Sequence, residues 1–291
     1  MKHIVSFSGG LSSALVVERV LSRYGRRNTD IVFMDTMAED RDNYRFMGDC
    51  QARWNKEIIT LADGRTPRQV AEDKHIIPNQ KIAPCTFELK IKPFTDWVKC
   101  QYGTGIFVDF RGALMLFSRI PVTIHIGYDI FEAHRCVPTK NNYNAHGWEV
   151  DFPLLWKPIE HRPYTQVVRD DWGIEPPRTY AMGFSHANCL GDTFCFKSGQ
   201  GDAIRTLINF PDQYHKGERW EARMRDHPTR KNYSILRDQS NGTVKPLTLK
   251  KLREQWEAKR STQPTLFDLD QRSAACVSCG VGDLMLTEET R

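Results

Sequence analysis

A short turn near the start of the chain has the residue types of an anion site: Ser8-Gly9-Gly10-Leu11-Ser12-Ser13. An apolar run that contains Ser6 predicts a strand before the turn, and apolar residues at helical spacing predict a helix after it. Such an arrangement gathers backbone N–H groups at a helix N-terminus, where they bind anions. The glycines permit close approach of a phosphate, and the serine hydroxyls add donors. The alternative is an ordinary strand-to-helix turn with serine caps.

A second candidate site residue follows the next predicted strand, at 30–36, which ends in Asp35 and Thr36. A carboxylate at the end of a neighbouring parallel strand can accept from a ribose hydroxyl or an adenine amine, or hold a metal. The alternative is that Asp35 caps the following helix.

Cys85 directly precedes a predicted helix, whose dipole would stabilise its thiolate. Lys90 and Lys92 add positive charge nearby. Such a cysteine can be a nucleophile, a sulfur carrier or a metal ligand, and the alternative is a small buried apolar residue.

Glu132 and Arg135 follow a predicted strand at 122–127, and their spacing of three places them on one face of a helical turn. The arginine could bind an oxyanion through two hydrogen bonds, with Glu132 orienting it. The alternative is a simple ion pair between the two side chains.

Two cysteine pairs lie in the second half of the chain. Cys189 and Cys195 are separated by five residues, whereas Cys276 and Cys279 have the two-residue spacing and following glycine of a metal knuckle. Four thiolates suit zinc or an iron–sulfur cluster, with Cys85 as a fifth candidate ligand. The alternative is reduced cysteines without metal.

The elements that would position these residues alternate between strand and helix in the first half of the chain. Strands are predicted at 30–36, 58–61, 122–127 and 179–183, and helices at 40–54 and 163–171, with a loop at 136–149. This pattern predicts an α/β fold with a parallel sheet, which binds ligands beyond the carboxyl ends of its strands. Helices predicted within 202–225 and after Thr248 then favour an α/β domain at 1–184 and a mainly helical, cysteine-containing region at 185–291.

Composition sets outer bounds on the function. The chain has 291 residues and a net charge of +5, which suits an anionic nucleotide and tolerates nucleic acid. It has no apolar run long enough to span a membrane and no signal peptide, so we expect a cytoplasmic protein that does not interact with membranes.

Residues 8–13 resemble the SGGxxS signature of the PP-loop, or adenine nucleotide α-hydrolase, superfamily. Its members bind ATP or an adenylylsulfate and cleave at the α-phosphate. Many members carry Asp where this chain has Ser12. With serine at this position, the motif resembles that of the phosphoadenylylsulfate-reductase-like branch, which includes phage-encoded proteins. The change removes one carboxylate that could hold Mg²⁺.

Four further segments are similar to elements of that branch: 33–39, 85–94, 127–135 and 188–199. The resemblance implies that nucleotide phosphates bind at 8–13, with the ribose or base near Asp35 and with Lys90 directed at a phosphate or sulfate. It also implies an iron–sulfur cluster held by Cys85, Cys189 and Cys195, with Cys276 or Cys279 completing the set.

The leading function that the resemblance implies is adenylation of an acceptor by ATP, with Lys90 and Arg135 stabilising the developing charge. Cys85 or a cluster sulfur would then deliver sulfur to a nucleic-acid or nucleotide acceptor. A sulfur-donor or reductant protein is an expected partner, and the chain could act as a homodimer.

Two alternatives remain: reduction of an adenylylsulfate by Cys279 or Cys85, and nucleotide binding for regulation without turnover. The reductases end in a Glu-Cys-Gly-x-His-type tail, whereas this chain has Ser before Cys279 and no histidine after it. That difference counts against reduction.

Overall fold

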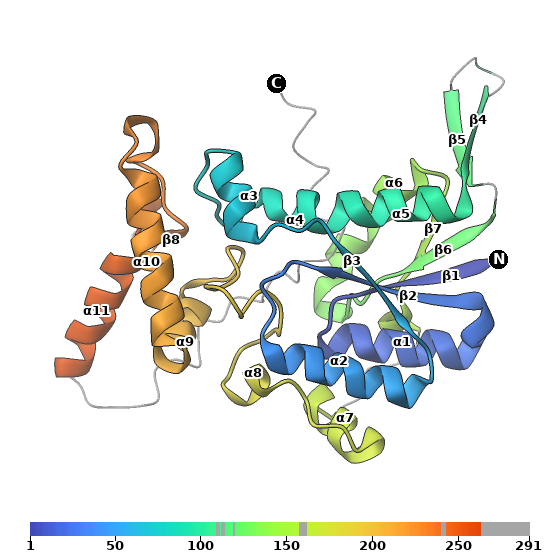
Figure 1. The fold of residues 1–291 in the computed structure, drawn as a ribbon, viewed down its shortest axis with the longest axis horizontal. Coiled ribbons are helices and arrows are strands. Elements are labelled where there is room, and N and C mark those ends of the chain that lie inside the picture. Colours follow the sequence, from blue (N-terminus) through green and yellow to red (C-terminus); the bar gives the residue numbers. More distant parts are fainter. Residues whose placement is uncertain (109–110, 112–113, 119, 157–161, 240–242, 263–291) are drawn as a thin grey trace.

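The computed structural model describes residues 1–108, 111, 114–118, 120–156, 162–239 and 243–262, and Figure 1 shows their arrangement. Cys276 and Cys279 lie outside the described residues. Within those ranges, no helix combines the length and the apolar composition that crossing a membrane requires.

A five-stranded parallel sheet forms the centre of the molecule, in the order β3-β2-β1-β6-β7. Its strands are β1 (Lys2–Phe7), β2 (Thr29–Asp35), β3 (Ile58–Ala62), β6 (Val122–His125) and β7 (Glu149–Asp151). The α/β fold class and the predicted strands at 30–36, 58–61 and 122–127 are therefore confirmed.

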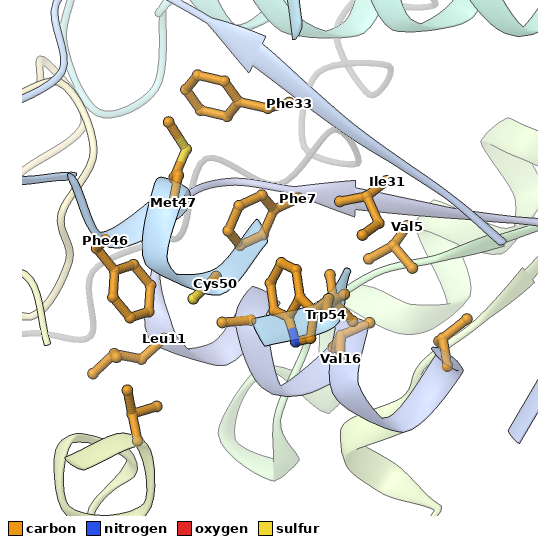
Figure 2. Close-up of a cluster of buried hydrophobic side chains, with 14 of the residues drawn as sticks. Val5, Phe7, Leu11, Val16, Ile31, Phe33, Phe46, Met47, Cys50 and Trp54 are labelled. Carbon is orange, nitrogen blue, oxygen red and sulfur yellow. The ribbon is translucent and has the colours of Figure 1, made fainter. Parts of the chain in front are cut away.

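Helices cover both faces of the sheet (Figure 1). One face packs against α1 (Leu11–Tyr24), α2 (Arg41–Trp54) and α7 (Tyr164–Trp172), and the other against α5 (Lys92–Tyr102) and α6 (Cys136–Asn144). Successive strand residues alternate between these faces: Val5 and Phe7 join the first cluster, and Ile4 joins the second. Figure 2 shows the first cluster, where strand side chains meet Met47, Cys50 and Trp54 of α2.

The chain reverses its direction across the sheet between β1 and β6. From β1 it continues to β2 and β3, and then crosses back through α3 (Pro67–Asp73), α4 (Pro84–Thr86), the π-helical η2 (Phe87–Ile91) and α5. A hairpin of β4 (Thr104–Val108) and β5 (Leu114–Ser118) then leads into β6, which pairs with β1. In such sheets, ligands bind in the crevice at the carboxyl ends of the strands where the order reverses.

The helices start where local signals predict. Asp40 caps α2 by accepting a hydrogen bond from Asp42 N at 2.9 Å. Thr66 and Gln69 form a reciprocal capping box at α3, with Pro67 in the first helical position.

The last described part of the chain forms a separate apolar cluster beside α3. It contains α9 (Gln200–Asn209), α10 (Pro211–Arg225), α11 (Leu249–Thr262) and a hairpin of β8 (Leu236–Asp238) and β9 (Lys245–Leu247). Phe196, Trp220 and Leu249 are buried in this cluster, which Ala71 and Ile77 join from the α3 region. Helices within 202–225 and after Thr248 are confirmed. The boundary at 184 stays a prediction.

Two sequence predictions are wrong. Residues 136–149, predicted as a loop, contain α6 and the start of β7, because Thr139, Tyr143 and Trp148 are buried among the polar residues. Residues 179–183, predicted as a strand, instead contain α8 (Arg178–Ala181), which starts directly after Pro177 and packs toward α1.

Short 3₁₀ helices complete the described elements. They are η1 (Arg26–Asn28), η3 (Ile130–Arg135), η4 (Pro153–Leu155) and η5 (Pro228–Arg230).

Candidate functional site

The glycine turn at residues 8–13 lies at the carboxyl end of β1, beside the point where the strand order reverses. Gly9 has a φ of +78°, and Gly10 precedes α1 without a side-chain cap. Ser13 braces the turn: its Oγ accepts from Ser8 N at 3.1 Å and donates to the Gly10 carbonyl at 2.9 Å. The serines therefore do not cap α1, and the predicted alternative of an ordinary serine-capped turn is not what the structure contains.

The other predicted turn residues occupy distinct positions. Ser6 pairs with Val32 inside the sheet, and Ser12 is half-buried in the first turn of α1. Gly127, at the end of β6, packs closely on the turn, because a Cβ at that position would lie 3.4 Å from Ser13 N.

Tyr180, from α8, contacts the turn and was not predicted as a site residue. Its hydroxyl oxygen accepts a hydrogen bond from Leu11 N at 3.2 Å, and a Cβ on Gly10 would lie 3.1 Å from that oxygen. The phenol oxygen therefore occupies the kind of position that an anion oxygen takes at a helix N-terminus. Because the sequence predicted a strand at 179–183, this contact was not expected.

Asp35 lies at the carboxyl end of β2, next to the turn. Its Oδ1 accepts from Met37 N at 2.8 Å and from the Tyr44 hydroxyl at 2.7 Å. The pKa of Tyr44 is raised well above its usual value. Burial is the largest cause, and the hydrogen bond to Asp35 is the second. Since Asp40 caps α2, Asp35 is not the helix cap.

Three cysteines and two lysines line one small pocket beside the end of β2, which we call the thiol pocket. Its lining includes Thr36, Cys85, Lys90, Cys189, Cys195 and Lys197. Both lysines are buried, at 5% and 6% exposure. The cavity volume of the pocket is about 10 Å³, which leaves room for about one water molecule.

The thiol pocket brings together predicted residues that are far apart in the sequence: Thr36, Cys85, Lys90, Cys189 and Cys195. Cys85 was predicted to precede a helix directly and instead lies in the first turn of the helical segment at 84–102, while Lys90 lies in its π-helical turn. Lys197 was not predicted as a site residue, although it is two residues beyond Cys195 in a segment that the resemblance covers.

Glu39 joins the loop after β2 to the loop that carries Cys189. Its carboxylate accepts from Cys189 N at 2.8 Å and from the Thr36 hydroxyl at 2.9 Å. Burial raises the pKa of Glu39, and the nearby Lys90 charge opposes that change. Cys189 has a φ of +57°, and its Sγ lies 3.5 Å from Thr36 Oγ1. The two loops are thus held together by buried hydrogen bonds.

Glu132 and Arg135 lie on η3, beyond the end of β6. They form an ion pair, and the Arg135 guanidinium carbon lies 4.2 Å from the centre of the Tyr128 ring. Arg135 is 7% exposed, and burial raises the pKa of Glu132 against the effect of that arginine. The predicted ion pair is present. Neither residue lines the thiol pocket.

The described residues do not form a metal site. Three thiols in one pocket have the donor chemistry of a soft-metal site. Two buried lysines share that pocket, however, and no three His, Cys, Asp or Glu side chains in the described ranges are arranged to hold a metal ion. A site with four thiolates would need Cys276 or Cys279, and we assign no chemical step to a metal.

Comparisons with known proteins were made by sequence and by structure. No protein-family model and no curated protein matches the chain. A solved structure of phosphoadenylyl-sulfate (PAPS) reductase from Candida auris, in its phosphate complex, is similar to it with a TM-score of 0.41 and 12% sequence identity. The match covers 64% of this chain and 80% of that chain. A likeness of this size does not indicate a reaction or a substrate.

Proposed function

We propose that the chain is an enzyme that binds an adenylylsulfate and reduces its sulfuryl group with thiols. The observation that carries this proposal is the thiol pocket, where three cysteines and two buried lysines lie beside the carboxyl end of β2. β2 is the strand next to β1, which leads into the glycine turn.

In the proposed complex, the turn at residues 8–13 binds the phosphate through backbone N–H groups other than that of Leu11, which donates to Tyr180. Asp35, at the end of β2, accepts from a ribose hydroxyl. Lys90 and Lys197 attract the sulfuryl group and stabilise the charge that develops there. The tight pocket means that the sulfuryl group enters by displacing side chains.

The proposed reaction has two steps. The Cys85 thiolate attacks the sulfuryl sulfur, the bond from sulfur to the phosphate oxygen breaks, and AMP leaves with the electron pair. A second pocket thiol then attacks Cys85 Sγ, forming a disulfide and releasing sulfite. Two thiols lose two electrons, the sulfate sulfur gains them, and an external dithiol restores the thiols. Because this reaction uses Cys85 and a second pocket thiol rather than Cys279, the difference between the tail of this chain and that of the reductases does not count against it.

The direct test incubates the purified protein with adenylylsulfate, or with its 3′-phosphorylated form, and dithiothreitol. We expect sulfite and the corresponding nucleoside phosphate in equal amounts. Cys85→Ser should abolish sulfite release, whereas Cys100→Ser, on the exposed surface of α5, should not. Sulfite release that persists in Cys85→Ser would contradict the role of Cys85, and no release by the wild type would contradict the reaction.

A second candidate is adenylation of an acceptor by ATP, followed by sulfur transfer, which the strand–turn–helix geometry of residues 8–13 favours. Incubation with α-labelled ATP and nucleic-acid acceptors separates the two functions. AMP and pyrophosphate would support adenylation, whereas nucleotide binding without turnover in either assay would indicate a regulatory protein.

A further inference from the structure

The side-chain amide of Asn43 is buried and makes no hydrogen bond to any described residue. The residue is 1% exposed, and neither its Nδ2 nor its Oδ1 has a hydrogen-bond partner among the described residues. Leaving a buried donor or acceptor unpaired costs about 1–3 kcal/mol. An apolar side chain would fill the same space without that cost.

The amide lies against the glycine turn. A Cβ on Gly9 would be 2.7 Å from Asn43 Nδ2 and 3.2 Å from Asn43 Oδ1. The side chain therefore packs directly on the Gly9 backbone, and glycine at that position is what permits the contact.

The start of α2 does not need this amide. Asp40 accepts from Asp42 N through its side chain, and its carbonyl accepts from Asn43 N at 2.9 Å. The N–H groups of Asp42 and Asn43 thus both find their acceptors on Asp40. Asn43 is on the first turn of α2, and Gly10 immediately precedes α1, so two helix N-termini meet at Gly9.

We propose that the Asn43 amide is a ligand-binding group of the anion turn, whose Nδ2 donates to an oxygen of the nucleotide's phosphate. This inference rests on the proposed binding of an adenine nucleotide at residues 8–13. A neutral donor adds specificity for an oxyanion without placing another charge near Lys90 and Lys197. The ligand supplies the hydrogen-bond partner that the described residues do not.

The test compares Asn43→Ala and the nearly isosteric Asn43→Asp with wild type, using calorimetric titration with AMP, inorganic pyrophosphate and adenosine. We expect Asn43→Ala to weaken AMP and pyrophosphate about tenfold, the size of one hydrogen bond to a charged group. Adenosine, which has no phosphate, should bind as it does to wild type. Asn43→Asp should weaken the binding of AMP and pyrophosphate further, because a carboxylate then faces these anions. Asn144→Asp, on the exposed surface of α6, is the matched control and should bind like wild type.

Thermal unfolding without ligand separates this role from a structural one. Removing an unpaired buried amide should leave the melting temperature unchanged or raise it. Unchanged AMP affinity in both variants would overturn the inference while leaving the proposed function intact, as would an equal loss for adenosine. A wild-type protein that binds neither AMP nor pyrophosphate would overturn the proposed function itself, and this inference with it.

Discussion

Gly191 makes the tightest backbone contact near the thiol pocket. Its N–H donates to the Ala38 carbonyl at 2.7 Å, and a Cβ at this position would lie 2.0 Å from the Glu39 carbonyl oxygen. Since the neighbour is backbone, it cannot rotate away as a side chain can. The glycine therefore sets how closely the Cys189 loop approaches the loop after β2.

We expect Gly191→Ala to lower the free energy of unfolding by about 3 kcal/mol, because the two loops must separate. Denaturant unfolding measures this change. The matched control is Gly48→Ala, inside α2, where a Cβ meets nothing within 4 Å and should stabilise by about 1 kcal/mol. Equal stabilities for the two variants would show that the loops do not pack as described.

The buried lysines give a second prediction at the residue scale. Replacing Lys90 or Lys197 by Met keeps much of the apolar stem but removes the charge from the thiol pocket. We expect each change to lower kcat/KM for sulfite release about 100-fold, the usual effect of losing one group that stabilises developing charge. Lys92→Met, on the exposed side of the same helical segment, is the control. Activity that survives both pocket substitutions would exclude the proposed role of these charges.

Motif spacing singled out residues that the fold brings together. Thr36, Cys85, Lys90 and the Cys189–Cys195 pair line one pocket, and their roles in binding or catalysis stay predictions. Asn43 could not be found this way, because its importance depends on a contact with Gly9 that no spacing along the chain encodes.

The short helix α8 is connected to the start of α1 through the hydroxyl group of Tyr180. We expect Tyr180→Phe to lower the free energy of unfolding by about 1 kcal/mol, because Leu11 N loses its acceptor at the start of α1. A melting temperature lower by about 3 °C is the corresponding observation. Tyr233→Phe, at an exposed position, should leave it unchanged. A Tyr180→Phe protein as stable as wild type would show that this contact contributes nothing.

Elements were predictable where one pattern dominated. The apolar runs of β2 and β6 follow from burial on both faces of a parallel sheet, and Thr66-Pro67 marks the start of α3. The failures at 136–149 and 179–183 have a common physical cause. In both segments few residues are buried, so tertiary packing of Tyr143 and the contact of Tyr180 decide the structure, rather than local periodicity.

At the scale of the whole molecule, buried histidines link stability to pH. His125 is fully buried, and burial lowers its pKa to about 4, while His3, which lies 3.0 Å from it, also has a lowered pKa. The folded protein keeps His125 neutral, whereas the unfolded chain takes up a proton near pH 6.5. Stability from this residue is therefore fully present above pH 6.5 and is lost as pH falls toward 4.

We expect His125 to account for about 3 kcal/mol of the stability lost between pH 6.5 and pH 4. Denaturant unfolding of wild type and His125→Asn across this range measures the difference. The variant should be less stable at pH 7 but should lose less on acidification. Parallel pH profiles for the two proteins would contradict this account.

Metal content is also a property of the whole chain, because the predicted ligands come from both of its halves. The metal prediction from the sequence requires one of that pair to join the pocket thiols. If it is correct, the purified protein contains zinc or iron by elemental analysis, and Cys276→Ser/Cys279→Ser lowers that content. Cys100→Ser is the control. A metal-free wild-type protein would show that the pocket cysteines act as thiols alone.

The pairing of β1 with β6 has a consequence for how the chain is made. Lys2 pairs with Val122, so the two strands are separated by 120 positions (122 − 2), whereas His3 pairs with Thr29 on the other side of β1. A ribosome releases β1 and β2 long before β6, and until then one edge of β1 has no partner. Unpaired apolar edges attract other strands. The anion turn is therefore synthesised at an open sheet edge, and its crevice is complete only after β6 has been synthesised as well.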